Sequence, residues 1–281
     1  MLKSNSFFVV LSMVFVLVLG WMPTAFAQGD LMVFPKRLIF EGNVKTSELN
    51  LANIGKDTAR YNISFVQYRM NEDGSFTEVN TPDSGQNFAD KFLRYYPRSI
   101  ILAPKESQVV KVQLIKTNLM EPGEYRSHIY FRAIPNLRPL GMEEIRKDST
   151  TMSIRLVPIF GITIPTIIRV GASTTKISLT NLDFAFRNDT IPVLELTFNR
   201  AGNMSSYGDL TVTYTSPTGK KTEVGRANGV AVYTPNILRK FMVSLVRKPG
   251  VDYRNGTLHV DYFPPGDTKT AKYAAADFKL K

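Results

Sequence analysis

The side chains that could carry out acid–base or metal chemistry are few and widely spaced in this sequence. His128 and His259 each lie in an alternating, strand-like stretch, and neither has a second ligand at a metal-binding spacing. The paired acids Glu72-Asp73 and Glu143-Glu144 lie in turn-like segments typical of solvated surface. Cysteine is absent, and no Gly-x-Ser-x-Gly nucleophile motif or phosphate-binding glycine loop occurs. The sequence therefore predicts a protein that is not an enzyme and binds no cofactor or metal.

One arginine has an unusual setting. Arg37 lies within the largely apolar segment 31–40, which is interrupted by Pro35. An arginine on the buried side of a strand needs a partner, and its planar fork of N–H donors suits a carboxylate. Alternation along the segment instead directs Arg37 outward into water, and periodicity alone favours that interpretation.

The remaining pattern predicts an all-β fold. Short alternating stretches occur at 47–53, 59–68, 109–115 and 125–134, and Asn71-Glu-Asp-Gly74 is a strong hairpin signal. A second series of short strands follows Gly171, and no stretch of the mature chain predicts a convincing helix. The predicted architecture is two immunoglobulin-like β-sandwich domains, residues 28–170 and 171–281.

The first 27 residues have the pattern of a secretory signal peptide. Lys3 precedes an apolar run at 7–19, and Thr24-Ala-Phe-Ala27 matches a cleavage site. The run is shorter than the roughly 20 residues that a transmembrane helix needs. The mature chain is therefore expected to be exported, with no membrane insertion. Its net charge of +11 before cleavage is spread along the sequence, without the aromatic-basic motifs of nucleic-acid binding.

The segment 151–170 predicts a strand of unusual length. It is rich in β-branched residues, and its two prolines, Pro158 and Pro165, suit a sheet edge or a bend because they lack an N–H. Alternation in its first half sets Ser153 and Arg155 on the face opposite to an apolar row made by Met152, Ile154 and Leu156. A long edge strand with an apolar row invites pairing with another chain.

Several strings in residues 31–170 resemble the periplasmic chaperones of pilus assembly, the chaperone–usher family. Arg37-Leu-Ile-Phe-Glu-Gly42 is similar to the family's first-strand pattern, and Leu49-x-Leu-x-Asn53 to its second strand. Leu102-Ala-Pro-Lys-Glu106 resembles a family turn, and the segment 124–135, which ends in Arg-Ala-Ile-Pro, resembles the penultimate strand. Beyond Gly171 the resemblance rests on domain order alone.

The resemblance implies a function. Family members bind pilus or fimbrial subunits that lack a strand and lend their own strand to the groove, which is a form of β-augmentation. It implies a periplasmic location and delivery to an outer-membrane usher, and the sequence leaves open whether the free protein caps its edge as a homodimer. The side chains that would fill subunit pockets are Met152, Ile154, Leu156, Pro158 and Phe160.

The resemblance also implies an anchor for the subunit's terminal carboxylate. An arginine of the first strand, here Arg37, and a lysine of the last strand normally hold it. The lysine position falls on Thr163 or Pro165, and neither is basic. The sequence leaves open whether another residue, such as Arg132 or Arg155, supplies the second charge or whether the anchor differs.

The alternative hypothesis is a structural or adhesive surface-fibre subunit built of two β-sandwiches. In that case the apolar row would lie inside the protein's own sheet, and the protein would polymerise or bind glycan. Exposure of the row distinguishes the two hypotheses.

Overall fold

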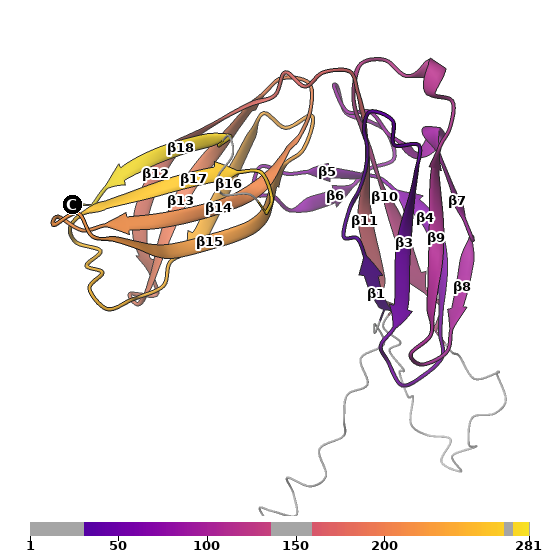
Figure 1. Ribbon diagram of the computed structural model, residues 1–281, viewed down its shortest axis with the longest axis horizontal. Helices are drawn as coiled ribbons and strands as arrows, with labels where there is room; N and C mark the ends of the chain where they lie inside the picture. Colours follow the sequence, from indigo (N-terminus) through magenta and orange to yellow (C-terminus); the bar gives the residue numbers. More distant parts are fainter. Residues whose placement is uncertain (1–30, 136–158, 267–271, 281) are drawn as a thin grey trace, which may run out of the picture.

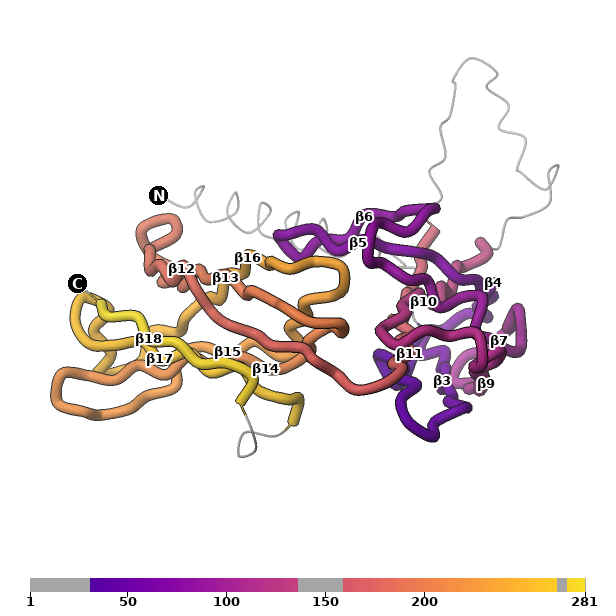
Figure 2. Tube along the Cα trace, turned by 90° about the horizontal axis from the view of Figure 1, so that it is seen from above, coloured from indigo at the N-terminus to yellow at the C-terminus, as the bar shows by residue number. Residues whose placement is uncertain are grey.

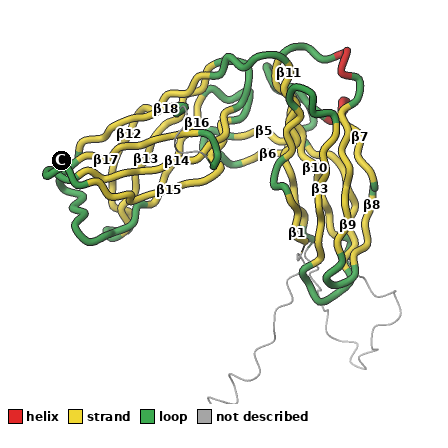
Figure 3. The backbone as a smooth tube through the Cα atoms, in the orientation of Figure 1, coloured by secondary structure: helices red, strands yellow, loops and turns green. Residues whose placement is uncertain are grey.

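The computed structural model describes residues 31–135, 159–266 and 272–280, and almost all regular structure in these ranges is β-strand (Figure 3). This confirms the predicted all-β class. The strands of the first half are β1 (Leu31–Phe34), β2 (Leu38–Phe40), β3 (Thr46–Asn53), β4 (Ala59–Val66), β5 (Tyr68–Met70), β6 (Phe76–Glu78), β7 (Leu93–Tyr96), β8 (Ser99–Leu102), β9 (Ser107–Leu114), β10 (Gly123–Ala133) and β11 (Gly161–Val170). Two single-turn 3₁₀ helices accompany them, η1 (Asp90–Phe92) and η2 (Thr117–Leu119).

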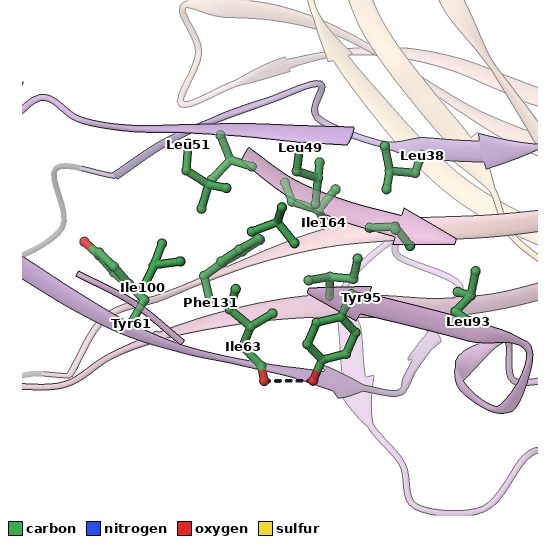
Figure 4. Packing of buried hydrophobic residues seen from close by; sticks show 14 of the residues in the cluster. Leu38, Leu49, Leu51, Tyr61, Ile63, Leu93, Tyr95, Ile100, Phe131 and Ile164 are labelled. Carbon is green, nitrogen blue, oxygen red and sulfur yellow. Dashed lines mark hydrogen bonds between the residues drawn. The ribbon is translucent and has the colours of Figure 1, made fainter. Parts of the chain in front are cut away.

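These strands form two stacked sheets and a separate hairpin. One sheet has the order β1-β3-β9-β7, the other has the order β2-β11-β10-β4-β8, and β5 pairs with β6. Leu49 and Leu51 of one sheet face Ile63 and Phe131 of the other in a closed apolar core (Figure 4). At its edge, the Tyr95 hydroxyl donates a hydrogen bond to the carbonyl of Ile63, with an O···O distance of 2.8 Å. A core of this kind needs no disulfide.

The apolar segment 31–40 is interrupted at Pro35, as the sequence indicates, and the interruption separates two strands. It is divided at Pro35, and its halves β1 and β2 belong to different sheets. Pro35 cannot donate to a ladder, so pairing stops there and the chain crosses from one layer to the other. Arg37 lies in this crossover. The crossing also leaves β2 beside β11 in parallel register over only three residues, 166–168.

The second half forms another sandwich. Its strands are β12 (Lys176–Arg187), β13 (Ile191–Ala201), β14 (Ser206–Thr215), β15 (Lys221–Val232), β16 (Leu238–Ser244), β17 (Thr257–Phe263) and β18 (Ala274–Lys279). One sheet has the order β12-β13-β16 and the other has the order β15-β14-β17-β18. Phe198, Tyr214 and Tyr262 are fully buried between them. The sequence patterns did not predict β7 or β18.

The two sandwiches meet in a bent arrangement, with β10 and β11 of the first facing the second (Figure 1). The β5–β6 hairpin projects from the first sandwich and lies against the second beside β16, as the view from above also shows (Figure 2). Strand β10 is buried on both faces over most of its length for this reason. Tyr125 and Ile129 face the core of the first sandwich, whereas Glu124, Arg126 and His128 face the junction with the second.

Candidate functional site

Strand β11 has one occupied edge and one largely open edge. It pairs with β10 along its whole length, from Gly161 to Val170, and with β2 only at 166–168. The Ala133 amide donates a hydrogen bond to the Phe160 carbonyl. Because hydrogen-bonded residues alternate along an antiparallel pair, the even-numbered residues of β11 bond to β10. The amides of Gly161 and Thr163 therefore point toward the other edge, where the described residues provide no strand partner.

Pro165 belongs to the same outward set as Gly161 and Thr163. Because its missing N–H would point away from β10, the proline removes no bond from the β10–β11 ladder. The sequence expectation that this proline suits an edge agrees with its position. The open edge thus offers carbonyl and N–H groups at 161–163 for one further strand.

The apolar row of even-numbered residues leaves the protein's own core at the start of β11. Ile164 is 4% exposed, Ile162 is partly buried against the first core, and Phe160 is 42% exposed. Ile159, on the other face, is 45% exposed. Among the residues expected to fill subunit pockets, Phe160 is described, and it is an exposed aromatic side chain in line with core positions.

The rest of the expected row lies outside the described residues. This applies to Met152, Ile154, Leu156 and Pro158, and also to Arg155. Thr163 is described and partly buried, opposite Tyr130 of β10 in the ladder. As an odd-numbered residue of β11, it faces away from the core row, on the same face as Ile167, which packs against the second sandwich.

Arg37 does not point into water, and the interpretation favoured by periodicity is wrong. Its guanidinium carbon lies 3.7 Å from the centre of the Tyr207 ring and 6.0 Å from that of Tyr233, both in the second sandwich. All three of its guanidinium nitrogens are buried, and none has a hydrogen-bond partner among the described residues. The crossover at Pro35 interrupts the strand, so the alternation of side chains along a strand does not determine the direction of the Arg37 side chain.

A second arginine lies at the same junction. Arg126 of β10 is 3% exposed, and its guanidinium carbon lies 4.4 Å from the centre of the Tyr233 ring. Its Nη2 donates to the carbonyls of Tyr68 at 3.2 Å and Thr234 at 3.3 Å, whereas Nε and Nη1 have no partner in the described part of the chain. Burial lowers the pKa of Arg126, and the nearby charge of Arg37 lowers it further. Both guanidinium groups lie near the ring of Tyr233.

The carboxylate nearest to this pair already has several partners. Glu124 has a fully buried side chain, and its Oε2 accepts hydrogen bonds from the Ser205 amide at 3.0 Å and from Arg169 Nε at 3.3 Å. The Ser205 hydroxyl donates to Oε1, and the Thr234 hydroxyl donates to the same oxygen at 3.4 Å. Glu124 and Arg169 thus join β10 and β11 to the loops of the second sandwich, and this network fixes the position of one domain against the other.

The β5–β6 hairpin supplies another connection between the sandwiches. The Lys240 amide of β16 donates to the Glu72 carbonyl at 2.6 Å. Met70 of β5 packs in a small buried cluster with Ile167, Ala231 and Tyr233. Tyr233, whose ring lies near both arginines, therefore packs against the hairpin and β11.

Arg132, one of the two residues considered for the second charge, is not at this junction, and the other, Arg155, lies outside the described residues. Arg132 lies six residues from Arg126 on β10, which is about 20 Å along a strand, and it is exposed. Opposite Pro165 lies His128, which is 4% exposed. Burial, and secondarily Arg126, lowers the pKa of His128 to about 3, so the imidazole is neutral at physiological pH.

The described residues provide no metal centre. They contain no group of three or more His, Cys, Asp or Glu side chains that could hold a metal ion. His259 lies within 3.0 Å of Asp261 and 2.5 Å of Asp277, in a partly exposed group on β17 and β18 that also includes Lys272. In the same ranges, no helix is long and apolar enough to cross a membrane.

The alternation around Arg126 is visible in the sequence, but it indicates a side chain exposed to water rather than a buried one. Glu124, Arg126 and His128 alternate with Tyr125, Ser127 and Ile129, and ionisable residues at every second position are typical of a strand with one solvated face. That polar face is covered by the second sandwich, and nothing local in the sequence indicates such a cover. The only available indication of a covering domain would be these three ionisable residues at alternate positions of one strand, close to a domain boundary.

Comparison with known proteins identified similar solved structures only. No protein-family model matches the sequence, and no curated protein matches it. The YadV chaperone is 10% identical with a TM-score of 0.43, and the alignment covers 90% of this chain and 100% of that one. The Pseudomonas aeruginosa CupB2 chaperone is 11% identical, with a TM-score of 0.42 and coverage of 89% and 100%. The class 5 fimbriae chaperone CfaA is 14% identical, with a TM-score of 0.41 and coverage of 90% and 99%.

Proposed function

We propose that this protein is a periplasmic chaperone that binds pilus or fimbrial subunits and completes their fold with its own strand. The observation that carries the proposal is the open edge of β11 at 161–163, next to an apolar row that leaves the protein's own core at Phe160. Backbone groups at such an edge bind an extended segment of a partner, and alternate side chains fill its pockets. The sequence extends the same row through Leu156, Ile154 and Met152.

The unpaired guanidinium of Arg37 supports the same function. It lies at the domain junction, on the side of the molecule where β11 ends, and its N–H donors lack partners in the described ranges. A terminal carboxylate of a bound subunit would satisfy those donors and would fix the register of the paired strands. Register matters because a shift of one residue would turn the apolar row away from the partner.

The location and the wider partners belong to the same proposal. The signal-peptide pattern of residues 1–27 supports export, and the periplasm is the compartment in which such subunits need protection. We further propose an outer-membrane usher as the acceptor of the complex and a self-capped homodimer as the free form. The homodimer follows from an edge that must be covered until it is used, and the usher is what the resemblance to the chaperone–usher family implies.

Co-purification from the periplasm tests the proposal. Tagged mature protein is expected to bring down a small β-rich partner, and Leu156→Lys is expected to abolish this. Ser153→Lys is the control, since the sequence alternation sets it on the opposite face with the same added charge. Equal loss in both variants, or an unfolded Leu156→Lys protein, would count against strand donation.

The alternative of a structural fibre subunit makes a different prediction. Its apolar row would be core, so Leu156→Lys would unfold the protein, and the wild type would polymerise without a partner. Size-exclusion chromatography of the purified mature protein separates long assemblies from a dimer or a one-to-one complex.

A further inference from the structure

The second sandwich has one end that lies away from the first sandwich (Figure 1). This distal end consists of residues 187–191, 216–223, 246–256 and 279–280. We propose that it binds the surface of an anionic lipid bilayer as a peripheral contact. The distal end is separate from β11 and from the domain junction, so the proposal does not rest on strand donation.

Backbone pairing brings these segments together from both sheets. β12 turns into β13 at 188–190, β14 turns into β15 at 216–220, and β18 ends opposite the start of β17. The segment after β16 connects the two sheets at this end. The Leu245 amide donates to a carbonyl of β13 at 2.8 Å, and the Val246 amide donates to a carbonyl of β15 at 2.7 Å. The ends of both sheets therefore form one surface.

The distal end carries most of the excess positive charge of the second sandwich. It has seven basic and three acidic residues, whereas residues 171–281 as a whole have fifteen and nine. Two of the three acids are already ion-paired, Glu223 with Arg226 at 3.0 Å and Asp252 with Arg254 at 3.0 Å. The other basic side chains of the distal end are exposed and form no ion pair within the described ranges: Arg187, Lys220, Lys221, Arg247, Lys248 and Lys279. A cluster of this size attracts an anionic lipid surface.

Exposed apolar side chains lie among these charges. Phe186, which precedes the distal end on β12, is 42% exposed, Ile191 is 45% exposed and Val246 is 56% exposed. The guanidinium carbon of Arg247 lies 5.5 Å from the centre of the Phe186 ring. A site for a soluble polyanion needs no such side chains. At a bilayer, by contrast, apolar side chains enter the interface while neighbouring Arg and Lys keep their charges at the headgroups.

Packing behind the surface fixes the apolar side chains in place. The Phe184 ring contacts Phe186 edge to face with centroids 5.2 Å apart, and it stacks on Tyr253 at 5.3 Å. The Tyr253 hydroxyl donates to the Val246 carbonyl at 2.9 Å. Tyr253 belongs to the core of the second sandwich. The surface is therefore preorganised, and binding costs it little conformational entropy.

Vesicle binding of the full mature chain tests the proposal. The protein is expected to co-sediment with vesicles of phosphatidylglycerol and phosphatidylcholine and to stay in solution with vesicles of phosphatidylcholine alone. Sodium chloride is expected to weaken binding, because it screens exposed charges. The double variant Lys220→Glu/Lys221→Glu is expected to bind at least about tenfold more weakly. Lys56→Glu/Lys111→Glu is the matched control, since it makes the same change in net charge at exposed lysines of the first sandwich.

A single introduced tryptophan identifies the end that meets the bilayer. The only native tryptophan, Trp21, lies in the signal-peptide segment, so the mature chain provides no background emission of this kind. In Val246→Trp, vesicles with phosphatidylglycerol are expected to shift the emission to the blue, and brominated lipid is expected to quench it. Leu119→Trp is the control, at a position of η2 in the first sandwich that is 64% exposed, and it is expected to show neither effect.

Equal binding to vesicles with and without phosphatidylglycerol would overturn the proposal, and so would equal loss in the two double variants. Binding of an oligonucleotide or an acidic protein through the distal end, without binding to either vesicle, would assign another class of partner and also overturn it. None of these results touches the proposed chaperone function. A partner that co-purifies with the wild type and is lost in Leu156→Lys would still establish strand donation.

Discussion

Arg126 at the domain junction and Arg200 within the second sandwich are both buried, and they should differ in what they contribute to stability. Arg200 of β13 donates to four carbonyl oxygens, those of Asn236 and Gly202 at 2.7 Å, Met204 at 3.0 Å and Pro235 at 3.3 Å. Arg126 makes two longer bonds, at 3.2 and 3.3 Å, and leaves two nitrogens without partners in the described part of the chain. Replacement of each by methionine, which has a similar length and no charge, tests this difference.

The magnitudes follow from the bonds that are lost. Arg200→Met leaves four carbonyl oxygens without this donor, at about 1 kcal/mol or more for each one that stays buried, so a loss of about 3–5 kcal/mol is expected. Arg126→Met loses two bonds worth about 1 kcal/mol each, but it also removes a buried charge that has no bonded anion. The two effects have opposite signs, and the expected change for Arg126→Met is within about 1 kcal/mol of zero.

Urea unfolding of the mature variants, followed by tyrosine emission and far-ultraviolet circular dichroism, measures both free energies of unfolding. Arg200→Met is expected to lower the free energy of unfolding by at least about 2 kcal/mol more than Arg126→Met does. If Arg126→Met costs as much as Arg200→Met, then Arg126 is a structural bridge between the domains, and its two unpaired nitrogens do not reduce its contribution to stability.

Two further predictions concern the β5–β6 hairpin and the buried histidine. A Cβ at Gly74 would meet the guanidinium of Arg239, whereas a Cβ at Gly42 meets nothing within 4 Å, and both glycines have positive φ. Gly74→Ala should therefore cost about 1 kcal/mol more than Gly42→Ala and should widen the interdomain distance in small-angle X-ray scattering; equal effects would remove the hairpin's role as a connection. His128 has a pKa of about 3 in the folded protein, below the unfolded value of about 6.5. The unfolded chain therefore binds the proton first as pH falls, and stability drops by up to about 1.4 kcal/mol per pH unit below pH 6.5. His128→Phe should flatten the pH dependence of unfolding between pH 6.5 and 4 relative to the wild type, and an unchanged slope would show that His128 can be protonated in the folded state.

Local sequence patterns were sufficient for the sheets but not for the junction between them. Alternation placed Leu49 and Leu51 on an inward face, and they are fully buried. The Asn71–Gly74 signal predicted the hairpin of β5 and β6. These features depend on residues two to four apart, and the physical rules of strands and turns act at that range.

Arg37 and Arg126 show where local patterns fail. Strand alternation predicted that Arg37 points into water. The ladder of β1 ends before Pro35, however, and the crossover turns the Arg37 side chain toward Tyr207. Arg126 lies on the polar face of β10, and that face is covered by residues more than 100 positions away, such as Thr234. Burial by a second domain is a long-range property that no window of a single strand contains.

A long strand over residues 151–170 was predicted from the sequence, and β11 occupies its described end; donation of this strand to a partner stays a prediction. Phe160 is exposed, Ile164 is core, and the strand from Gly161 has an open edge. The proposed pocket-filling residues Met152, Ile154, Leu156 and Pro158 stay a prediction, because they lie outside the described residues.

Amide hydrogen exchange at the start of β11 tests the central claim most directly. The Gly161 and Thr163 amides point to the open edge, while those of Ile162 and Ile164 bond to β10 and serve as internal controls. On addition of the partner that co-purifies with the protein, Gly161 and Thr163 are expected to become strongly protected, with little change at Ile162 and Ile164. A stable complex in which Gly161 and Thr163 exchange as fast as in the free protein would contradict strand donation.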